Sequence, residues 1–308
     1  MKEPTWNNNV MENGLICLSN AQEIYRINRE QAISWVDQAI SYFRKNEDSL
    51  CNLAQCYYIK AYLLWKNDKD TSKALFTESI KTHILGNKNE DFREHKFYKF
   101  VTVNTSNIES ILHNIRLVHP SNFNDPMDCP IAVDTKNGIP DTSLLNGLRV
   151  GCYGVVDEEK KYFLDASKWS YYADSHKGIC IEYDFSNLEF KNEYALMGKI
   201  KYEAQYRPDR GIVGGSLLTK SNDYEQEDEW RIIWYDELLT SAIPVYINIQ
   251  PLKIVNIYIG YGYKCDVSEI QRYIMHFRNQ NPHIRVYKIM PSEENFYQLT
   301  AKEIQCHD

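Results

Sequence analysis

The sequence predicts an α+β protein in which N-terminal helices precede a bent, mainly antiparallel sheet. Two observations support this fold class. Apolar residues recur with helical spacing up to about residue 85, whereas from about residue 96 they gather in short runs rich in Ile, Val and Tyr. These runs do not alternate regularly with helical patterns, as βαβ units would. We therefore expect a helical region at 1–90 and an α+β domain at 91–308.

The helical region is expected to form helices between about Ser19 and Leu85, because two apolar stripes follow i, i+3, i+4 spacing. The stripes consist of Ala32, Ile33, Val36, Ala39, Ile40 and Phe43, and then of Leu53, Cys56, Tyr57, Ala61 and Leu64. Asp70 or Thr71 is the expected N-cap of a further helix, and Gly86 with Asn87 is a stop signal.

The polar segment 87–96 is the expected linker to the α+β domain. Strands are expected where short β-branched runs are bounded by Gly, Pro, Asn or Asp. These runs cover residues 96–103, 148–155, 178–183, 199–202, 230–234, 243–249, 254–259 and 284–289. Helices are expected at 106–114 and 267–280, and the glycine-rich segment 211–216 is expected to be a flexible flap.

Composition narrows the possible partners. The formal net charge of −7 argues against binding nucleic acid by bulk charge, because phosphate binding depends on Lys and Arg. The eight cysteines form no CxxC pair, so we expect no metal site. The first twenty residues do not resemble a signal peptide, and no apolar run is long enough for a membrane span. A cytoplasmic location with reduced thiols is therefore expected.

Three clusters of polar and aromatic residues are candidates for a site, because pockets combine a few polar groups with a rigid apolar frame. The first contains Asn124 and Asp125, which either stabilise a turn before Pro126 or brace a neighbouring pocket. The second begins at Trp169 and ends at Gly178.

Within this second cluster, Trp169, Tyr172 and Ala173 can share one face of a helix that Gly178 would end. His176 follows one turn later. It is either a capping or core histidine, or a group that binds a phosphate or stacks on a base.

The third cluster is the acidic run that leads into Trp230. Strand alternation would place Glu227, Glu229 and Arg231 on one face and Trp230 on the other. One interpretation is a solvated acidic edge. The alternative is that two carboxylates beside an Arg provide a general base or stabilise an oxocarbenium ion.

The order of four motifs resembles that of a bacterial domain-of-unknown-function family, number twenty-nine seventy-one in that series. The matching segments are, in chain order, 98–100, 123–128, 169–178 and 224–231. They correspond to a Tyr-Lys-Tyr/Phe strand, Phe-Asn-Asp-Pro-Phe-Asp, Trp-x-x-Tyr-Ala-x-x-His-x-Gly and Tyr-x-x-Glu-x-Glu-Trp-Arg. Met127 replaces the second Phe, and Tyr171 stands where many relatives have His. The family carries no settled activity.

The motif order is also similar to that of ADP-ribosyltransferases. Residues 171–174 are similar to the Tyr-Phe-Ala-Asp run of poly-ADP-ribosylating enzymes, and residues 227–229 to the Glu-x-Glu of arginine-directed ones. This resemblance implies an NAD-dependent ADP-ribosyltransferase or NAD-cleaving effector, which would suit a toxin or a phage-defence system. NAD would be its substrate, and a protein, an RNA, a DNA or water its acceptor.

The same resemblance assigns roles to the candidate residues. The catalytic residues would be Glu229, Glu227 and His176. The residues that bind NAD would be Tyr98, Lys99, Trp169, Tyr171, Tyr172 and Arg231. Asn124 and Asp125 would be structural residues at the site.

The alternative is a non-enzymatic module that senses a nucleotide or binds protein. The N-terminal helices resemble tetratricopeptide-type hairpins, which implies a protein partner for this region; a helical cap without a binding role is the other interpretation. Convergence of a Glu, the Tyr residues and Lys99 or His176 in one place would favour the enzyme.

Overall fold

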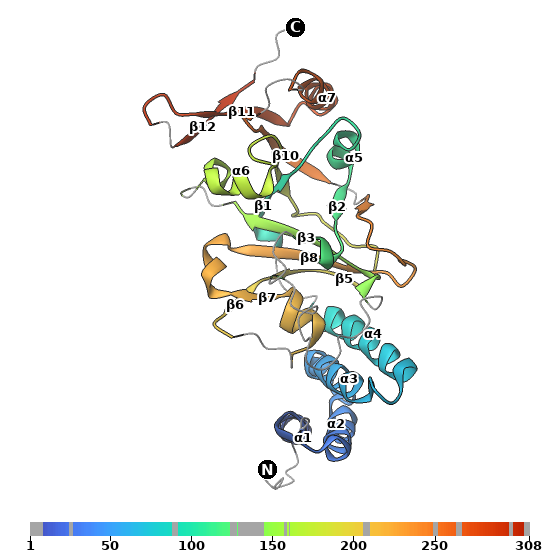
Figure 1. Ribbon diagram of the computed structural model, residues 1–308. Helices are drawn as coiled ribbons and strands as arrows, with labels where there is room; N and C mark the ends of the chain where they lie inside the picture. The colour runs from blue at the N-terminus through green and yellow to red at the C-terminus, as the bar shows by residue number, and fades with distance from the viewer. Residues whose placement is uncertain are drawn as a thin grey trace.

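A computed structural model gives the fold of the chain. It describes residues 9–24, 27–87, 92–123, 128, 145–156, 159, 161–205, 210–248, 252–262, 267–295 and 298–304. The N-terminal part consists of four successive helices, shown in blue to cyan in Figure 1. They are α1 (Val10–Ile24), α2 (Arg29–Phe43), α3 (Leu50–Leu64) and α4 (Lys69–Gly86). None of the helices in the described ranges is long and apolar enough to cross a membrane.

The helix ends follow local capping chemistry. Asn28 caps α2 by accepting a hydrogen bond from the backbone N–H of Gln31. Asp68 caps α4 in the same way, at 3.1 Å from the N–H of Thr71. The expectation that Asp70 or Thr71 is this cap is therefore wrong, because both residues already lie inside the helix. The predicted stop at Gly86 and Asn87 agrees with the end of α4.

Helix α1 begins earlier than the apolar stripes predict. Its buried face includes Cys17, Leu18 and Ala21, which join the core of the helical region. Gly14 lies on the same face, where a Cβ atom would stand only 2.7 Å from the Phe43 ring. The small residue lets α1 and α2 approach closely, so packing compensates for the weak helical pattern before Ser19.

The rest of the chain is built on an eight-stranded sheet with the order β12-β11-β10-β4-β1-β3-β8-β5 (Figure 1). The strands are β1 (Lys96–Val101), β3 (Leu148–Val155), β4 (Ile179–Asp184), β5 (Ala195–Lys199), β8 (Glu229–Tyr235), β10 (Lys253–Ile259), β11 (Arg285–Pro291) and β12 (Leu299–Glu303). Within the described ranges, β10 and β11 form the parallel pair of this sheet, and α7 (Val267–Gln280) connects them. The expected class, an α+β protein with N-terminal helices and a large, mostly antiparallel sheet, is confirmed.

Two small sheets accompany the large one. Strands β2 (Ile115–Leu117) and β9 (Val245–Ile247) pair antiparallel, and β6 (Lys201–Glu203) and β7 (Thr219–Ser221) pair parallel. Neither β2 nor β7 is predicted from the sequence, because three residues are too few to establish a period of two.

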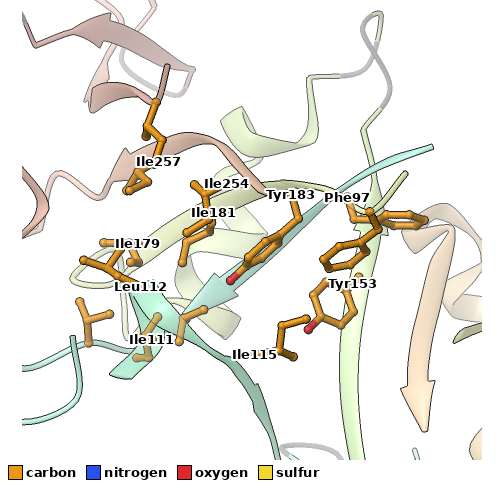
Figure 2. Packing of buried hydrophobic residues seen from close by; sticks show 14 of the residues in the cluster. Phe97, Ile111, Leu112, Ile115, Tyr153, Ile179, Ile181, Tyr183, Ile254 and Ile257 are labelled. Atoms are coloured by element: carbon orange, nitrogen blue, oxygen red, sulfur yellow. The ribbon is translucent and has the colours of Figure 1, made fainter. Parts of the chain in front are cut away.

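The largest apolar core lies on the face of the sheet covered by α5 (Ile108–His113), α7 and β2. Figure 2 shows this packing, with Ile111 and Leu112 of α5 beside Ile179 and Ile181 of β4. Phe92 joins the same core. The segment 87–96 is therefore not purely a polar linker, because part of it is anchored in the sheet domain.

The opposite face of the sheet is covered in two parts. Helix α6 (Ala166–Tyr172) packs over β1, β4 and β10 through the buried Trp169. Helix α4 and the π-helical turn η8 (Ile212–Leu217) pack over β3, β8 and β5. The segment expected as a flexible flap is thus the start of η8, and most of its residues are buried.

The pairing between β1 and β3 is short. Only the pairs Phe97–Val155 and Tyr98–Gly154 join the two strands, whereas β1 pairs with β4 along its whole length. Further along β3, Val150 exchanges backbone hydrogen bonds with Val118 instead. The sheet therefore forks between β1 and β3, and this feature decides where the side chains near the fork lie.

Candidate functional site

A row of residues crosses four central strands on the face covered by α6. The register pairs Glu182 with Tyr98, Tyr98 with Gly154, and Gly154 with Glu229. Directly opposed residues project to the same side of a sheet, so the four positions share one face. A Cβ atom on Gly154 would stand 2.3 Å from Cζ of Tyr98. The absent side chain thus lets the Tyr98 ring lie over β3, between β1 and Glu229.

Glu229 is the first residue of β8 and is almost completely buried. Its carboxylate accepts hydrogen bonds from Nε of Arg231 at 2.6 Å and from Nζ of Lys220 at 3.3 Å. Its backbone N–H lies 2.9 Å from Oη of Tyr202. Burial alone would raise the pKa of Glu229, but the charges of Arg231 and Lys220 outweigh it and hold the pKa below its ordinary value.

Arg231 is fully buried and extends the charge network. Its Nη2 atom donates to Asp128 at 2.6 Å, and its Nη1 atom donates to the carbonyl of Leu217 at 3.1 Å. The guanidinium carbon lies 5.2 Å from the centre of the Phe123 ring. Every side of this cation is therefore satisfied, as a buried charge requires.

Lys220 of β7 joins three carboxylates. Its Nζ atom lies 2.7 Å from Glu227, 3.3 Å from Glu229 and 3.7 Å from Asp128. It also lies 4.6 Å from the centre of the Tyr224 ring. Burial acts to lower the pKa of Lys220, but the surrounding carboxylates outweigh burial and raise it above its ordinary value. Lys220 is therefore a protonated residue that holds the carboxylates in place, and it does not act as a base.

Glu227 reaches the same network from outside the strand. It is the last residue of the 3₁₀-helix η9 (Asn222–Glu227), and Asp228 then turns the chain with a left-handed φ of 43°. The prediction that strand alternation brings Glu227 beside Glu229 is wrong, because β8 begins only at Glu229. The two carboxylates nevertheless meet at Lys220. The Tyr172 hydroxyl donates to the other oxygen of Glu227 at 2.9 Å.

Lys168 adds a second buried ammonium group beside this network. It belongs to α6, is 9% exposed, and places Nζ 5.8 Å from the centre of the Tyr98 ring. Burial lowers the pKa of Lys168, and the charges of Glu227, Asp165 and Glu229 oppose that shift. Helix α6 therefore brings one cation and one phenol, from Tyr172, to the same face of the sheet.

Five residues predicted from the sequence are brought together here. They are Tyr98, Tyr172, Glu227, Glu229 and Arg231. Two others from α6 are not: Tyr171 is 74% exposed, and Trp169 is a core residue whose indole N–H donates to the carbonyl of Phe163 at 2.6 Å. Adjacent helix positions point about 100° apart, so one short helix cannot aim all three rings at one place.

Lys99 lies on the opposite face of the sheet. It follows Tyr98 directly, and successive strand residues face opposite sides. Its Nζ atom donates to the carbonyl of Arg116 of β2 at 3.3 Å. Lys99 therefore does not join the carboxylates on the α6 face, although the charge of Glu229 acts on it from the other side of the sheet. Lys168 and Lys220 are the cations of the cluster.

His176 lies at the far side of Trp169. Its ring packs parallel to the Trp169 ring, with the centres 6.5 Å apart, and 4.7 Å from the centre of Tyr261. Asp174, Ser175 and His176 all have positive φ angles, a conformation that costs non-glycine residues energy. This strained turn presents His176 to Tyr261. Among the described residues, the aromatic contacts of His176 are with Trp169 and Tyr261, and neither belongs to the Glu229 cluster.

The remaining predicted residues, Asn124 and Asp125, lie outside the described residues. Their neighbours Phe123 and Asp128 both contact Arg231, so both ends of that motif meet the cluster. Asp128 stood in the motif and could have been included from the sequence. Nothing in the sequence pattern indicates a role for Lys220, because it lies on a strand of only three residues.

Glu182 is a second buried carboxylate on the same face of the sheet. Its Oε2 atom accepts hydrogen bonds from Nδ2 of Asn256 at 2.6 Å and from the Tyr258 hydroxyl at 3.2 Å. The sequence does not mark Glu182 as buried, because the alternation of side chains along 178–183 is the same whichever face of the strand is buried. Among the described residues, no group of three or more His, Cys, Asp or Glu side chains could hold a metal ion.

The arrangement pairs three carboxylates (Asp128, Glu227 and Glu229) with two cations (Lys220 and Arg231), flanked by Lys168 and by tyrosine rings. Glu227 has the more accessible carboxylate of the Glu pair, with a side chain 16% exposed against 8% for Glu229. Comparisons of the chain with protein-family models, curated proteins and solved structures give no match. The resemblances to the domain-of-unknown-function family and to ADP-ribosyltransferases therefore stay predictions from the motifs.

Proposed function

We propose that this chain cleaves the bond between nicotinamide and ribose in NAD and transfers ADP-ribose to a macromolecule or to water. The observation that carries the proposal is the meeting of Tyr98, Tyr172 and Glu227 with the Lys220 and Glu229 pair on one face of the sheet. The chemistry needs aromatic groups for the nicotinamide, donors for the phosphates, and a carboxylate beside the developing oxocarbenium ion.

In the proposed reaction the C1′–N bond of NAD breaks and its electron pair leaves with nicotinamide. C1′ then bonds to the oxygen or nitrogen of the acceptor, which loses a proton. Glu227 is the carboxylate proposed to face C1′, because its side chain keeps more solvent access than that of Glu229. Glu229 is the proposed positioning residue: it holds Lys220 and Arg231, and through Lys220 it orients Glu227.

The cationic and aromatic side chains fit the rest of the substrate. Lys168 is proposed to bind the pyrophosphate, because it is the ammonium group of α6 beside Tyr98. The exposed Tyr172 ring is proposed to line the nicotinamide and ribose, and the buried Tyr98 ring to form the floor beneath them. Removing one preorganised charge of this kind typically lowers the rate of reaction about 10²–10³-fold.

Release of nicotinamide from NAD tests the proposal, with candidate protein, RNA and DNA acceptors present and absent. Glu227→Gln keeps the shape of the side chain and removes its charge, so turnover should fall about 10²–10³-fold while the fold survives. Glu225→Gln is the matched control, because Glu225 is an exposed carboxylate of the same η9 helix. Equal nicotinamide release by wild type and Glu227→Gln would remove Glu227 from the mechanism.

A second candidate is a module that binds NAD or a related nucleotide without cleaving it. It is favoured by two observations. Neither Lys99 nor His176 joins Glu229 and the tyrosines, the convergence expected of an enzyme. The cluster is also paired internally, since Glu229 is already neutralised by Arg231 and Lys220. Under this alternative, wild type would bind NAD in a calorimeter and release no nicotinamide with any acceptor.

We also propose that the N-terminal helices act as tetratricopeptide-like hairpins that bind a protein partner, in a cytoplasmic toxin or phage-defence system. Exposed apolar side chains on and after α1, namely Val10, Leu15 and Ile27, support a contact surface there. Growth arrest and NAD loss on expression of wild type, but not of Glu227→Gln, would support the effector role.

A further inference from the structure

Lys99 occupies the fork between β1 and β3. Beyond the pair Tyr98–Gly154 the two strands no longer pair with each other, and the Lys99 side chain lies across the opening. Its Nζ atom stands 4.5 Å from the centre of the Tyr153 ring. A Cβ atom on Gly151 would stand 3.2 Å from Nζ, so the glycine provides the space in which the amine lies.

The charge of Lys99 has no acidic partner among the described residues. No Asp or Glu oxygen of that part of the chain lies within 4.0 Å of its Nζ atom, and its hydrogen bond goes to the carbonyl of Arg116. The charge of Arg116 repels it, and the charge of Glu229, beyond ion-pair distance, attracts it. An ammonium group has three donors, so two remain for another acceptor. A largely surrounded cation without a carboxylate in direct contact is costly unless something compensates it.

Tyr153, whose ring lies against the Lys99 amine, supplies a second polar atom on the same face of the sheet. It is 2% exposed, and its hydroxyl has no hydrogen-bond partner in the described structure. Figure 2 shows this hydroxyl pointing toward Ile115, the residue before Arg116 on β2. Buried hydroxyl groups are normally hydrogen-bonded, so an orphaned one marks a place where a partner is absent. Lys99 itself keeps part of its surface open to solvent.

We propose that the fork between β1 and β3 is a binding site for a small oxyanion, a carboxylate or phosphate group held by Lys99 with the Tyr153 hydroxyl. The anion would accept hydrogen bonds from the free donors of Lys99 and would neutralise the repulsion between Lys99 and Arg116. This site lies on the face of the sheet opposite Glu229, and it is independent of the proposed reaction with NAD.

Calorimetric titrations of the whole protein with inorganic phosphate and with acetate test this site. Lys99→Met keeps the length of the side chain and removes the charge, so the affinity for the preferred anion should fall about 10- to 100-fold, the effect of one charge-assisted hydrogen bond. Lys96→Met is the matched control, because Lys96 is an exposed lysine of the same strand. A preference for phosphate or for acetate in wild type identifies which oxyanion the site takes.

A pH series with wild type alone keeps the test valid if Lys99→Met does not fold. Burial lowers the pKa of Lys99 to about 8. Tyr153 of β3 and Tyr183 of β4, which share its face of the sheet, titrate higher because burial raises their pKa values. Two groups act on it from the other face: burial raises the pKa of Cys152, and the charges of Arg231 and Lys220 hold the pKa of Glu229 low. Acetate keeps one charge over this range, so its affinity should fall about tenfold per pH unit above about 8, as the ammonium is lost.

Three results would overturn the proposal. They are equal affinities of wild type and Lys99→Met, an acetate affinity that does not change between pH 7 and 10, and no heat of binding with either anion. None of these results bears on nicotinamide release, because the proposed NAD site lies on the other face of the sheet.

Discussion

Replacing Gly154 with Ala tests the geometry that brings Tyr98 beside Glu229. The new Cβ atom would stand 2.3 Å from Cζ and 2.4 Å from Oη of Tyr98, and real Cβ atoms do not approach other atoms so closely. The Tyr98 ring is 4% exposed and packed within the sheet face, so it cannot move aside freely. Overpacking of this kind costs about 1–3 kcal/mol in the free energy of unfolding.

Urea denaturation of five proteins, a double-mutant cycle and one control, separates this clash from general effects of a Gly→Ala change. Tyr98→Leu removes the ring, and in that background Gly154→Ala should cost much less, so the double-mutant cycle should give a coupling energy of about 1–3 kcal/mol. Gly198→Ala is the matched strand control. Its Cβ atom would be 3.1 Å from methyl groups of Leu196 and Leu218, which can shift slightly, so its stability should change by less than about 1 kcal/mol.

The result that would refute the reasoning is a Gly154→Ala protein as stable as Gly198→Ala, with no coupling to position 98. The Tyr98 ring would then not lie over β3. If the clash is present but nicotinamide release is unchanged, the position of the ring is right and its proposed role at the site is wrong.

Three further predictions concern Glu229, the α4 cap and Lys99. Glu229→Gln should lower the free energy of unfolding by about 3–5 kcal/mol in urea titrations, because it leaves Arg231 buried with fewer partners. The folded-state pKa of Glu229 lies below its ordinary value. The stabilisation from the ionised Glu229 is therefore complete above that ordinary value and is lost as the pH falls through the folded-state pKa. Acid titrations of Glu229→Gln should lack this loss of stability. Asp68→Ala should cost about 1 kcal/mol in a thermal melt and Asp70→Ala much less, because Asp68 accepts the capping hydrogen bond. The lowered pKa of Lys99, about 8, means that the unfolded chain holds the Lys99 proton at pH values where the folded chain has lost it. The stability of wild type relative to Lys99→Met should therefore rise from pH 8 to roughly 10.4, while the buried Cys and Tyr groups lower the stability of both proteins alike.

The parts of the fold that the sequence predicts well are the long periodic ones. The helix expected at 267–280 coincides with α7, and the strand expected at 148–155 coincides with β3. Both have enough residues for a period to stand out. The three-residue strand β7 does not, and with it the sequence gives no indication of Lys220, on which the cluster depends.

The site itself was predictable where local periodicity governs it. Alternation along β8 correctly places Glu229 and Arg231 together, and their side chains are 2.6 Å apart. The same alternation already excludes Tyr98 and Lys99 from sharing a face. The entry of Glu227 from a 3₁₀-helix depends on the left-handed φ of Asp228, a non-glycine residue for which sequence gives no such signal.

Helix α4 has one further consequence, for how the chain unfolds. Phe76, Ile80 and Ile84 of this helix share an apolar core with Val150 of β3 and Ile233 of β8, and Lys81 pairs with Glu237 at 3.0 Å just beyond β8. Separating the helices from the sheet would therefore expose apolar surface on both sides. We expect the two regions to melt in a single cooperative transition, and a chain cut near residue 90 to aggregate. A force or a partner acting on α1 and α2 would then be transmitted through α3 and α4 to the strand that carries Glu229.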